Sequence, residues 1–491
     1  MRSEIAEVAE RNLADLVWAA PRSDRVALLD HATGRSYRYA ELRNAAERCV
    51  AALARRGLQP GDAVALVFGN SAEFVSAYYG VLLAGGVVVP LDPIGTADEW
   101  GAVLSLSGTG FVIGMAGTTA PAAHVIGWNE ILAEDSVRPR FAAGGEQAAL
   151  LLSSSGTQGL PKQVILTHRN LTANLTQIDL VHQLTARDVV LGLTPFRHIY
   201  GMQMAMNPTL RAGGTLVTVS TPFSATDLLD VVERRRITVA YLVPSVLAEL
   251  TRCRDVQQYD TTSLRLVFSG GAPLPPAVAE ACTELLKVPV VQGYGMTEAG
   301  CTHAPLDGRS PTPGSIGLPL PGTETRFVDP DTRQDVDGEG SGEIWVRGPQ
   351  VSPGYLETPD TLVPIVDSEG WLHTGDVGRR DVQGYVTITG RLKSLIKYKG
   401  HQVAPGELEA VLLTHPHVLD AVVVGVPDEV AGEIPKAFVV LSTPVPLDEV
   451  SAFVAQQVAP YKKIRQIEAV ERVPRTATGK VIGDLGGVSD G

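Results

Sequence analysis

The chain has 491 residues, of which 44% are hydrophobic and 19% are charged, and its formal net charge is −13. This length exceeds what one hydrophobic core usually holds, so we expect a globular protein of at least two domains. The negative charge, with no basic run longer than Arg234-Arg235-Arg236, argues against nucleic acid and anionic membrane surfaces as main partners.

The cysteines and the apolar segments indicate in which cellular compartment the protein is expected. The four cysteines are scattered and show no metal-ligand spacing, so we expect reduced thiols in a cytoplasmic protein. Residues 1–11 are too charged for a signal peptide. The apolar run 78–89 is too short and too glycine-rich to cross a bilayer.

Helical and strand patterns alternate through the first half of the chain. Apolar residues at helical spacing predict an amphipathic helix within 36–57, which ends at Gly57. The next predicted elements are a strand at 63–68, a helix at 71–83 and a strand at 87–91. The same order of strand, helix and strand recurs through 111–250, which predicts parallel α/β layers.

From residue 313 onward the pattern changes to short alternating segments, such as 343–347 and 385–389. We expect a small β-barrel or sheet over about 313–390 that completes an N-terminal domain of residues 1–391. Residues 392–491 are predicted to form a mobile C-terminal α+β domain with its hinge at Lys393. Its predicted elements are a helix at 406–413, strands at 419–426 and 437–441, and a helix at 447–458. The predicted fold class is thus α/β, with layered α/β subdomains and a small β-barrel hinged to a small α+β domain.

A loop rich in hydroxyl groups lies between two apolar runs, 149–152 and 164–166. Hydroxyls, backbone N–H groups and the ammonium of Lys162 between two strands suit a polyphosphate. The spacing does not fit the common nucleotide motif G-x-x-x-x-G-K-[ST], and a plain polar hairpin is the alternative. The candidate phosphate ligands are Ser154, Ser155, Gly156, Thr157, Gln158, Gly159 and Lys162.

A second glycine-rich motif, Gln292-Gly293-Tyr294-Gly295-Met296-Thr297-Glu298, follows an apolar strand. An aromatic ring between two glycines can stack on a purine, while the glycines allow a ligand to approach the backbone. The neighbouring hydroxyl and carboxylate suit a phosphate and its Mg²⁺. A β-turn with a capping threonine is the alternative interpretation.

These motifs, together with 397–405, 426–433 and 460–463, resemble those of the adenylate-forming (ANL) superfamily of acyl-CoA synthetases, adenylation domains and luciferases. Within that superfamily, the stretches 397–405, 426–433 and 460–463 are most similar to the branch of 4-coumarate–CoA ligases and medium- and long-chain acyl-CoA ligases. The resemblance covers nearly the whole chain, from Tyr37 to Lys480. It implies an acid–thiol ligase that uses ATP, Mg²⁺ and coenzyme A and releases AMP. A carboxylate would attack ATP to give an acyl-adenylate, and a thiol would then displace AMP.

The resemblance also implies roles in nucleotide binding. Tyr294 would bind adenine, Asp376 would accept the ribose hydroxyls, and Arg391 would steady the ribose or phosphate. Read without the family, Asp376 and Arg391 are a turn aspartate and a surface arginine. The implied ligands are Thr297 for the α-phosphate, Thr157 and Glu298 for Mg²⁺, and, around the nucleotide, Gly271, Ala272, Pro273, Gln292, Gly293, Gly295 and Met296.

A third set of residues concerns the acid and the thiol. Segment 195–201 resembles the entrance to the family's acyl pocket, and its lack of an acidic residue favours a plain carboxylic acid. By the resemblance, Lys480 would stabilise the charge that develops during adenylation, with His198 and Lys397 as further catalytic residues. A core histidine and a solvated tail lysine are the alternatives. The implied acyl pocket is His198, Tyr200, Gly271, Gly295, Met296 and Ala299, and the implied CoA and hinge residues are Lys393, Lys397, Lys399, Gly400 and Gln402.

Two glutamines depart from the family's phosphate loop: Gln158 replaces a hydroxyl residue, and Gln163 replaces the glycine after Lys162. A side chain at 163 would cost about 1 kcal/mol or displace the loop from the phosphates. Since the thioesterification residues match, we hypothesise that adenylation is slow, or that a separate adenylating enzyme supplies the acyl-adenylate, so that the protein mainly forms the thioester. The alternatives are a normal two-step ligase, loading of a carrier protein, and a silent homologue that binds an acyl-adenylate. A monomer or homodimer is expected.

Overall fold

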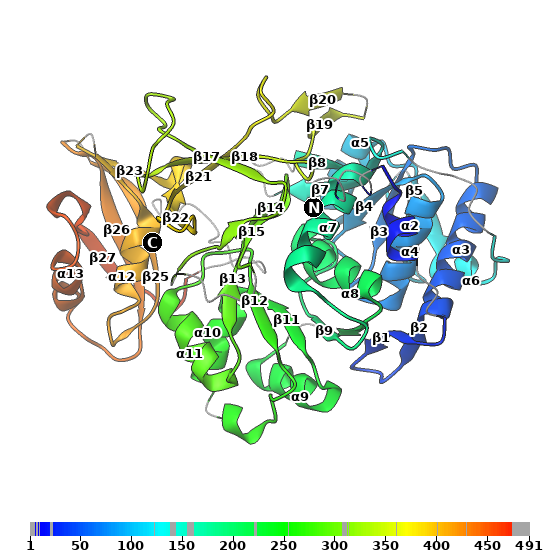
Figure 1. The fold of residues 1–491 in the computed structure, drawn as a ribbon, viewed down its shortest axis with the longest axis horizontal. Helices are drawn as coiled ribbons and strands as arrows, with labels where there is room; N and C mark the ends of the chain where they lie inside the picture. Colours follow the sequence, from blue (N-terminus) through cyan, green and yellow to red (C-terminus); the bar gives the residue numbers. More distant parts are fainter. Residues whose placement is uncertain are drawn as a thin grey trace.

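The computed structural model places two layered α/β units beside a set of antiparallel strands and a small C-terminal unit (Figure 1). The structure describes Ile5, Val8 and residues 10–473 except 20–22, 122, 138–143, 155–161, 220–222, 254, 307–311, 313, 360, 400 and 429. The side chains of Ser154 and Gln402 also lie outside the described set. In the part of the chain that is described, no helix combines the length and apolar character needed to cross a membrane.

The first layer is an eight-stranded sheet in the order β20-β19-β8-β7-β4-β3-β5-β6. Its strands are β3 (Ala63–Val67), β4 (Val87–Leu91), β5 (Phe111–Gly114), β6 (His124–Gly127), β7 (Ala148–Ser154), β8 (Lys162–Thr167), β19 (Gly354–Thr358) and β20 (Thr361–Pro364). Its helices are α3 (Tyr39–Arg55), α4 (Ala72–Leu83), α5 (Ala97–Ser107) and α6 (Trp128–Leu132). Strands β7, β4, β3, β5 and β6 run parallel, whereas β7 and β8 form an antiparallel hairpin. The carboxyl ends of the parallel strands therefore meet at one edge, where the predicted phosphate loop begins.

The second layer is a seven-stranded sheet in the order β13-β12-β11-β9-β10-β1-β2. Its strands are β1 (Val26–Asp30), β2 (Ser36–Arg38), β9 (Val189–Gly192), β10 (Thr215–Thr218), β11 (Val239–Leu242), β12 (Leu266–Ser269) and β13 (Val290–Gln292). The other helices of the two layers are α2 (Leu13–Val17), α7 (His168–His182), a π-helix (Gly201–Met206), α8 (Asn207–Ala212), α9 (Ala225–Arg235), α10 (Pro244–Arg252) and α11 (Pro276–Leu286). From β10 to β13 the pairing along the sheet is parallel, which confirms the predicted α/β layers.

One hydrophobic core joins the two layers. It contains the aromatic side chains of α4, the apolar side chains of α7 and inward-facing residues from both sheets. Every residue of α4 except Glu73 is buried, as expected for a helix that is apolar on all sides. The two sheets therefore share one core and hold the loops between them in fixed positions.

The antiparallel strands form two further sheets. The smaller contains β14 (Tyr294–Met296), β15 (Gly300–Ala304) and β16 (Leu318–Pro319). The larger is a four-stranded sheet of β17 (Glu324–Val328), β18 (Gly342–Arg347), β21 (Leu372–Arg380) and β22 (Val386–Arg391), in that order. The strands β19 and β20 come between β18 and β21 in the chain, yet they extend the eight-stranded sheet.

The small C-terminal unit is a five-stranded sheet with two helices (Figure 1, left). Its elements are β23 (Ile396–Tyr398), β24 (His401–Val403), α12 (Pro405–Leu412), β25 (Val418–Asp428), β26 (Gly432–Leu441), α13 (Leu447–Ala455) and β27 (Gln466–Ala469). It has its own hydrophobic core. The guanidinium of Arg252 on α10 donates a 2.9 Å hydrogen bond to the backbone carbonyl of Leu419, which ties this unit to the second layer.

The predicted helices and strands are present, with shifts at their ends that have local causes. The predicted barrel is not formed by the described pairing: the strands within 313–390 are divided among three sheets, because β19 pairs with β8 and β20 pairs with β19 instead of with β18 and β21. Helix α3 begins at Tyr39 because Ser36–Arg38 pairs with β1. The helix α4 begins after Ser71, whose Oγ accepts the N–H of Phe74 at 3.2 Å as an N-cap. Strand β26 is longer than predicted, since it pairs with β25 along its whole length.

Candidate active site

The two apolar runs around the predicted phosphate loop form the strands β7 and β8, with Ser154 opposite Lys162. Lys162 therefore lies at the base of the loop, and its side chain is exposed. The other predicted loop ligands, Ser155 to Gly159, lie outside the described residues. The Nζ atom of Lys162 lies 5.1 Å from the ring centroid of Tyr355 on β19, a cation–π distance.

Tyr355 connects Lys162 to the predicted magnesium ligand. Its hydroxyl donates a 2.8 Å hydrogen bond to Oε1 of Glu298. Burial, together with the charge of Glu298, raises the pKa of Tyr355, so the hydroxyl stays protonated and acts as a donor. A cation, a phenol and a carboxylate thus lie side by side next to the phosphate loop. Sequence reasoning missed Tyr355, because only the pairing of β19 with β8 brings it here.

Gln163 does not share this surface. Its side chain is fully buried, and Nε2 donates a 3.3 Å hydrogen bond to the carbonyl of Val103 on α5. Its Oε1 is buried without a hydrogen-bond partner among the described residues. Neighbouring residues of a strand point to opposite faces, so Gln163 points into the protein. One of the two reasons for expecting slow adenylation therefore loses its physical basis.

Three residues predicted to bind adenine and ribose meet at one point. The hydroxyl of Tyr294 on β14 donates a 2.5 Å hydrogen bond to Oδ2 of Asp376. Arg391 pairs with Asp376 across β21 and β22, and its Nε donates to Oδ1 at 2.5 Å. Burial and the nearby Asp376 raise the pKa of Tyr294, so the phenol remains a donor. Asp376 is only 5% exposed, and its two oxygens are held in fixed directions.

The glycines on either side of Tyr294 are required by the protein itself. A Cβ atom at Gly293 would lie 2.2 Å from Cζ of Phe268 and 2.8 Å from the carbonyl oxygen of His303. A Cβ atom at Gly295 would lie 2.2 Å from the carbonyl oxygen of Gly300. Both distances are far below normal contact, so these glycines let β14 pack against its neighbours.

The predicted loop 271–273 lies beside the motif that begins at Gln292. Oε1 of Gln292 accepts the backbone N–H of Leu274 at 2.5 Å, which fastens this loop to the end of β13. Gly271 has φ of +85°, a left-handed conformation that favours glycine. The structure thus brings together two candidate nucleotide segments that follow the neighbouring strands β12 and β13.

Tyr200, an expected acyl-pocket residue, lies near the same loops. Its hydroxyl is 3.0 Å from each of the carbonyl oxygens of Leu242 and Phe268, near the ends of β11 and β12. Its ring packs on Gly270, where a Cβ atom would be only 2.8 Å from Cε2. Among the other predicted residues, Ala299 is fully buried and its N–H bonds the carbonyl of Met296 at 3.1 Å. Tyr200 therefore joins the acyl segment to the nucleotide loops.

The segment around His198 is fixed by polar contacts. The N–H of His198 donates to the carbonyl of Pro195 at 3.1 Å. The guanidinium of Arg197 makes a 2.7 Å ion pair with Asp92, which follows β4. The arginine that departs from the family pattern thus has a partner in the first layer.

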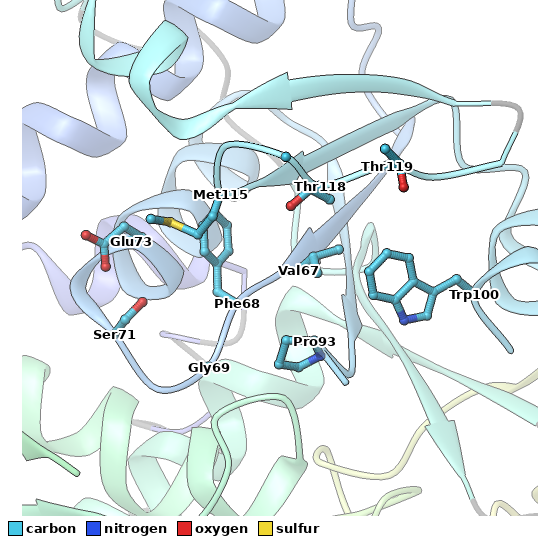
Figure 2. Close-up of a pocket in the computed structure, with 11 residues that line it drawn as sticks. Val67, Phe68, Gly69, Ser71, Glu73, Pro93, Trp100, Met115, Thr118 and Thr119 are labelled. Atoms are coloured by element: carbon cyan, nitrogen blue, oxygen red, sulfur yellow. The ribbon is translucent and has the colours of Figure 1, made fainter. Parts of the chain in front are cut away.

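A cavity of about 580 Å³ lies at the carboxyl ends of β3 and β5 (Figure 2). It is lined by Val67, Phe68, Gly69, Ser71, Glu73, Pro93, Trp100, Met115, Gly117, Thr118 and Thr119. This set includes no residue that the sequence predicted for the site, as far as the described residues go. The sequence gives no signal for it because the lining comes from separate helices, strands and loops, and Glu73 is the one charged side chain among the described residues that line it.

The predicted CoA and hinge residues lie at the start of the small unit. Lys393 belongs to a short 3₁₀ turn, Leu392–Ser394, directly after β22. The backbone N–H of Lys397 donates to Oε2 of Glu433 at 2.7 Å, and Lys399 has φ of +48°. Lys480 and Gly400 lie outside the described residues, as does the side chain of Gln402. Within the described ranges, no group of three His, Cys, Asp or Glu side chains could hold a metal ion by itself.

Comparisons with known proteins identify the family of the chain. Residues 17–356 match the family model described as AMP-binding enzyme, and residues 407–480 match the AMP-binding enzyme C-terminal domain. The 4-coumarate-CoA ligase 1 of Narcissus pseudonarcissus is 35% identical, over 94% of this chain and 90% of that protein. The 4-coumarate--CoA ligase 1 of Oryza sativa subsp. japonica is 37% identical, over 98% of this chain and 93% of that protein.

Solved structures give the same result. The anthranilate CoA ligase AuaEII in complex with anthranoyl-AMP superposes with a TM-score of 0.89 at 26% identity and covers 97% of both chains. ATP-bound MatB from Rhodopseudomonas palustris has a TM-score of 0.89 at 29% identity, over 96% of this chain and 97% of that chain. The chain therefore belongs to the AMP-binding enzyme family, and within the adenylate-forming superfamily to the acyl-CoA ligase branch of acid–thiol ligases.

Proposed function

We propose that the protein converts a carboxylic acid into its CoA thioester through an acyl-adenylate and that it carries out both half-reactions. The observation that carries the proposal is the convergence of Tyr294, Asp376 and Arg391 at one end and Lys162 and Glu298 at the other. These groups match the chemistry of a nucleotide: an aromatic ring and a buried carboxylate for the nucleoside, and a cation and a carboxylate for phosphates and metal.

In the first half-reaction, a carboxylate oxygen bonds to the α-phosphorus of ATP and pyrophosphate leaves. Asp376 accepts hydrogen bonds from the ribose, and Lys162 lies where it can neutralise the leaving phosphates. Glu298 has oxygen donors that suit Mg²⁺, with one of its oxygens oriented by Tyr355. Magnesium would neutralise phosphate charge there, together with the predicted ligand Thr157. Lys480 is the proposed source of a further positive charge at the α-phosphate.

In the second half-reaction, the sulfur of CoA bonds to the acyl carbon, the bond from that carbon to AMP breaks, and the thiol proton leaves. We propose that residues 392–491 form a domain that rotates about Lys393 and brings Lys397, Lys399, Gly400 and Gln402 to the CoA route. The separate core of the small unit supports this. His198 and Tyr200, with Gly271, Gly295, Met296 and Ala299, are the proposed acyl-pocket residues.

The position of Gln163 favours a working adenylation step. A side chain that is buried against α5 leaves the surface around Lys162 unobstructed by that glutamine. Gln158 lies outside the described residues, so the supply of acyl-adenylate by a separate enzyme is kept as one outcome of the test below.

The test is detection of acyl-CoA by mass spectrometry from two sets of reactions. One set contains an acid, ATP, Mg²⁺ and CoA, and the other contains the preformed acyl-adenylate and CoA. Because the relatives include ligases of 4-coumarate and anthranilate, hydroxycinnamic and benzoic acids form the first panel, followed by medium-chain acids. Lys162→Ala is the control for the ATP set, since it leaves the second half-reaction intact.

Each result has a distinct meaning. Thioester from both sets supports the proposal, and thioester from the adenylate set alone means that adenylation is lost. With neither product, the same panel is repeated with a phosphopantetheinyl carrier protein, and an acyl-carrier product means that CoA is the wrong acceptor. If no acceptor is acylated, the protein only binds its ligand, and the proposal is wrong.

A further inference from the structure

The turn that presents Asp376 is an irregular part of the pairing between β18 and β21. Glu343 pairs with Val377 and Trp345 pairs with His373, so the stretch of β21 between these pairs is longer than that of β18. The surplus residues fall within 374–376, and Gly375 there has φ of +71°. Extra residues in a bulge lose their partners in the ladder. The backbone N–H that loses its partner strand in this turn must therefore donate to another group.

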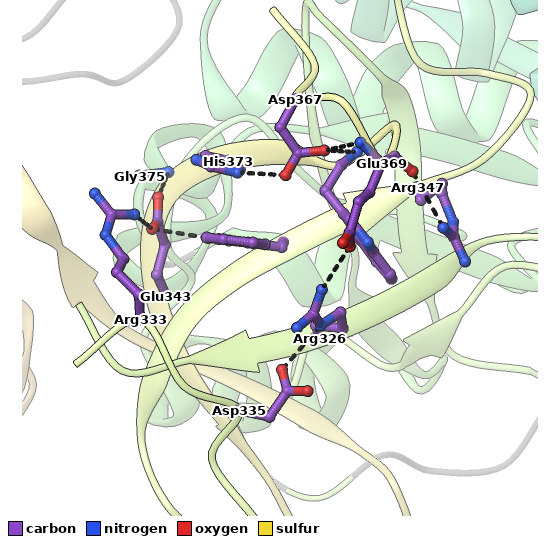
Figure 3. Close-up of polar contacts among 11 residues, drawn as sticks. Arg326, Arg333, Asp335, Glu343, Arg347, Asp367, Glu369, His373 and Gly375 are labelled. Carbon is purple, nitrogen blue, oxygen red and sulfur yellow. Dashed lines mark hydrogen bonds and ion pairs between the residues drawn. The ribbon is translucent and has the colours of Figure 1, made fainter. Parts of the chain in front are cut away.

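Glu343 accepts that N–H from the neighbouring strand (Figure 3). Its Oε1 accepts the backbone N–H of Gly375 at 3.1 Å, and its Oε2 accepts Nε1–H of Trp345 at 2.8 Å. The residue is only 4% exposed, and the guanidinium of Arg333 lies 3.8 Å from Oε2. The carboxylate presents one acceptor oxygen to each donor, whereas the amide of a glutamine would turn its NH₂ group toward one of the two donors.

The residues on either side of Gly375 are fixed as well. Oγ1 of Thr374 donates to the carbonyl of Ile344 at 2.6 Å and accepts the N–H of Asp376 at 3.1 Å. Glu343 and Thr374 therefore hold the backbone directly before Asp376. The direction of the Asp376 carboxylate, which bonds Tyr294 and Arg391, depends on this support.

We infer that Glu343 is a positioning residue for ribose recognition, acting through Gly375 on Asp376. The inference deepens the proposed function and rests on it, since Asp376 is the proposed ribose acceptor. Glu343 contacts the turn through the backbone N–H of Gly375, so it fixes the conformation of the turn and does not depend on the side chains there. Glu343 lies behind the turn and is not required to touch the nucleotide.

The substitution Glu343→Gln tests this, because the amide keeps the size but has one acceptor oxygen for two donors. We expect affinity for AMP, measured by calorimetric titration, to fall about tenfold. Affinity for 2′,3′-dideoxy-AMP, which lacks the ribose hydroxyls, should change by less than about twofold. Glu343→Asp, which withdraws the carboxylate by one methylene, should have the same effect and serves if the first variant does not fold. Trp345→Phe is the matched control: it removes the other hydrogen bond of Glu343 and should keep the preference for AMP.

The outcomes separate the inference from the proposed function. Equal weakening of AMP and the dideoxy nucleotide by Glu343→Gln would show a general structural role and overturn the inference. If the unsubstituted protein itself does not prefer AMP, the assignment of Asp376 is wrong and the inference falls with it. In that case formation of thioester in the mass-spectrometric test still decides the proposed function independently.

Discussion

The phenolic oxygen of Tyr294 lies 2.5 Å from Oδ2 of Asp376, although the two residues are 82 positions apart in the chain. The other carboxylate oxygen accepts Nε of Arg391 at 2.5 Å. The aromatic group proposed for adenine and the carboxylate proposed for ribose are thus one hydrogen-bonded unit. Its members come from three strands in two different sheets.

The first prediction concerns Asp376→Asn. The amide offers one oxygen to Tyr294, Arg391 and the ribose, and its NH₂ group faces donors. We expect AMP to bind about 10–100-fold more weakly. Tyr294→Phe keeps the ring for stacking and should lower AMP affinity by only about threefold. Calorimetric titration checks both, and a larger loss for Tyr294→Phe than for Asp376→Asn would contradict the proposed roles.

The second prediction concerns Gln163. Replacing it with glycine empties a buried position in β8, so we expect the melting temperature to fall and pyrophosphate release to stay the same or decrease. Gln163→Met fills a similar volume and removes the buried Oε1 that has no partner among the described residues. It should be neutral or stabilising by up to about 1 kcal/mol. A faster adenylation in Gln163→Gly, with unchanged melting temperature, would revive the idea that this side chain obstructs the phosphate loop.

The third prediction concerns Tyr355→Phe, which keeps the ring beside Lys162 but removes the donor to Glu298. The carboxylate then loses its orientation toward the proposed magnesium site. We expect KM for MgATP to rise about 3–10-fold, with the Mg²⁺ dependence of the rate shifted to higher concentration. Affinity for AMP without metal should stay the same. A loss of AMP affinity equal to the rise in KM would mean that Tyr355 supports the whole site rather than the metal.

The fourth prediction is a loss of stability in acid. Burial lowers the pKa of His168 to about 4 and those of His182 and His303 to about 3, from an ordinary value of 6.5. These histidines are neutral when folded, whereas the unfolded chain binds protons below pH 6.5. Their contribution to stability is therefore complete above 6.5 and falls by about 1.4 kcal/mol per pH unit for each histidine as the pH drops toward 4.

Scanning calorimetry between pH 7.5 and 4.5 measures this effect. The variant His182→Gln, which can still bond the hydroxyl of Tyr241, should show a weaker dependence of melting temperature on pH. His124→Gln, at an exposed position, is the control and should keep the original dependence. An equal slope in all three proteins would show that His182 takes up its proton in the folded state.

Much of the fold could be predicted from local patterns, since the apolar periodicity of a helix or strand and the turn residues that end it are close together in the sequence. Strand β4 begins and ends where the sequence predicts. The motif residues Tyr294, Asp376 and Arg391 are also found together, as the family resemblance implies. Tyr355 and Glu343 could not be found in this way. Their roles depend on strand pairing and on a bulge, which bring together residues that no motif connects.

The burial of Gln163 shows a second limit of prediction from sequence: a residue can be assigned to the site although its side chain points elsewhere. A departure from a motif suggests a change at the ligand, yet whether the side chain reaches the ligand depends on the face of the strand it occupies. Here the residue before it, Lys162, lies on the exposed face, and Gln163 bonds to α5. Side chains alternate between the two faces of a strand, but which face points to the ligand is known only once the position of the strand in its sheet is known.

The path of the chain through β18, β19, β20 and β21 has a mechanical consequence. The polypeptide leaves the four-stranded sheet after β18, adds two strands to the eight-stranded sheet, and returns at β21. Two crossings therefore fasten these sheets together, so they cannot slide apart without breaking the pairing of β19 with β8. The same connection links the strand that carries Lys162 to the sheet that carries Asp376 and Arg391, the residues proposed for the phosphates and the ribose. The proposed rotation about Lys393 fits this connection, because Lys393 lies after Arg391, where the four-stranded sheet ends.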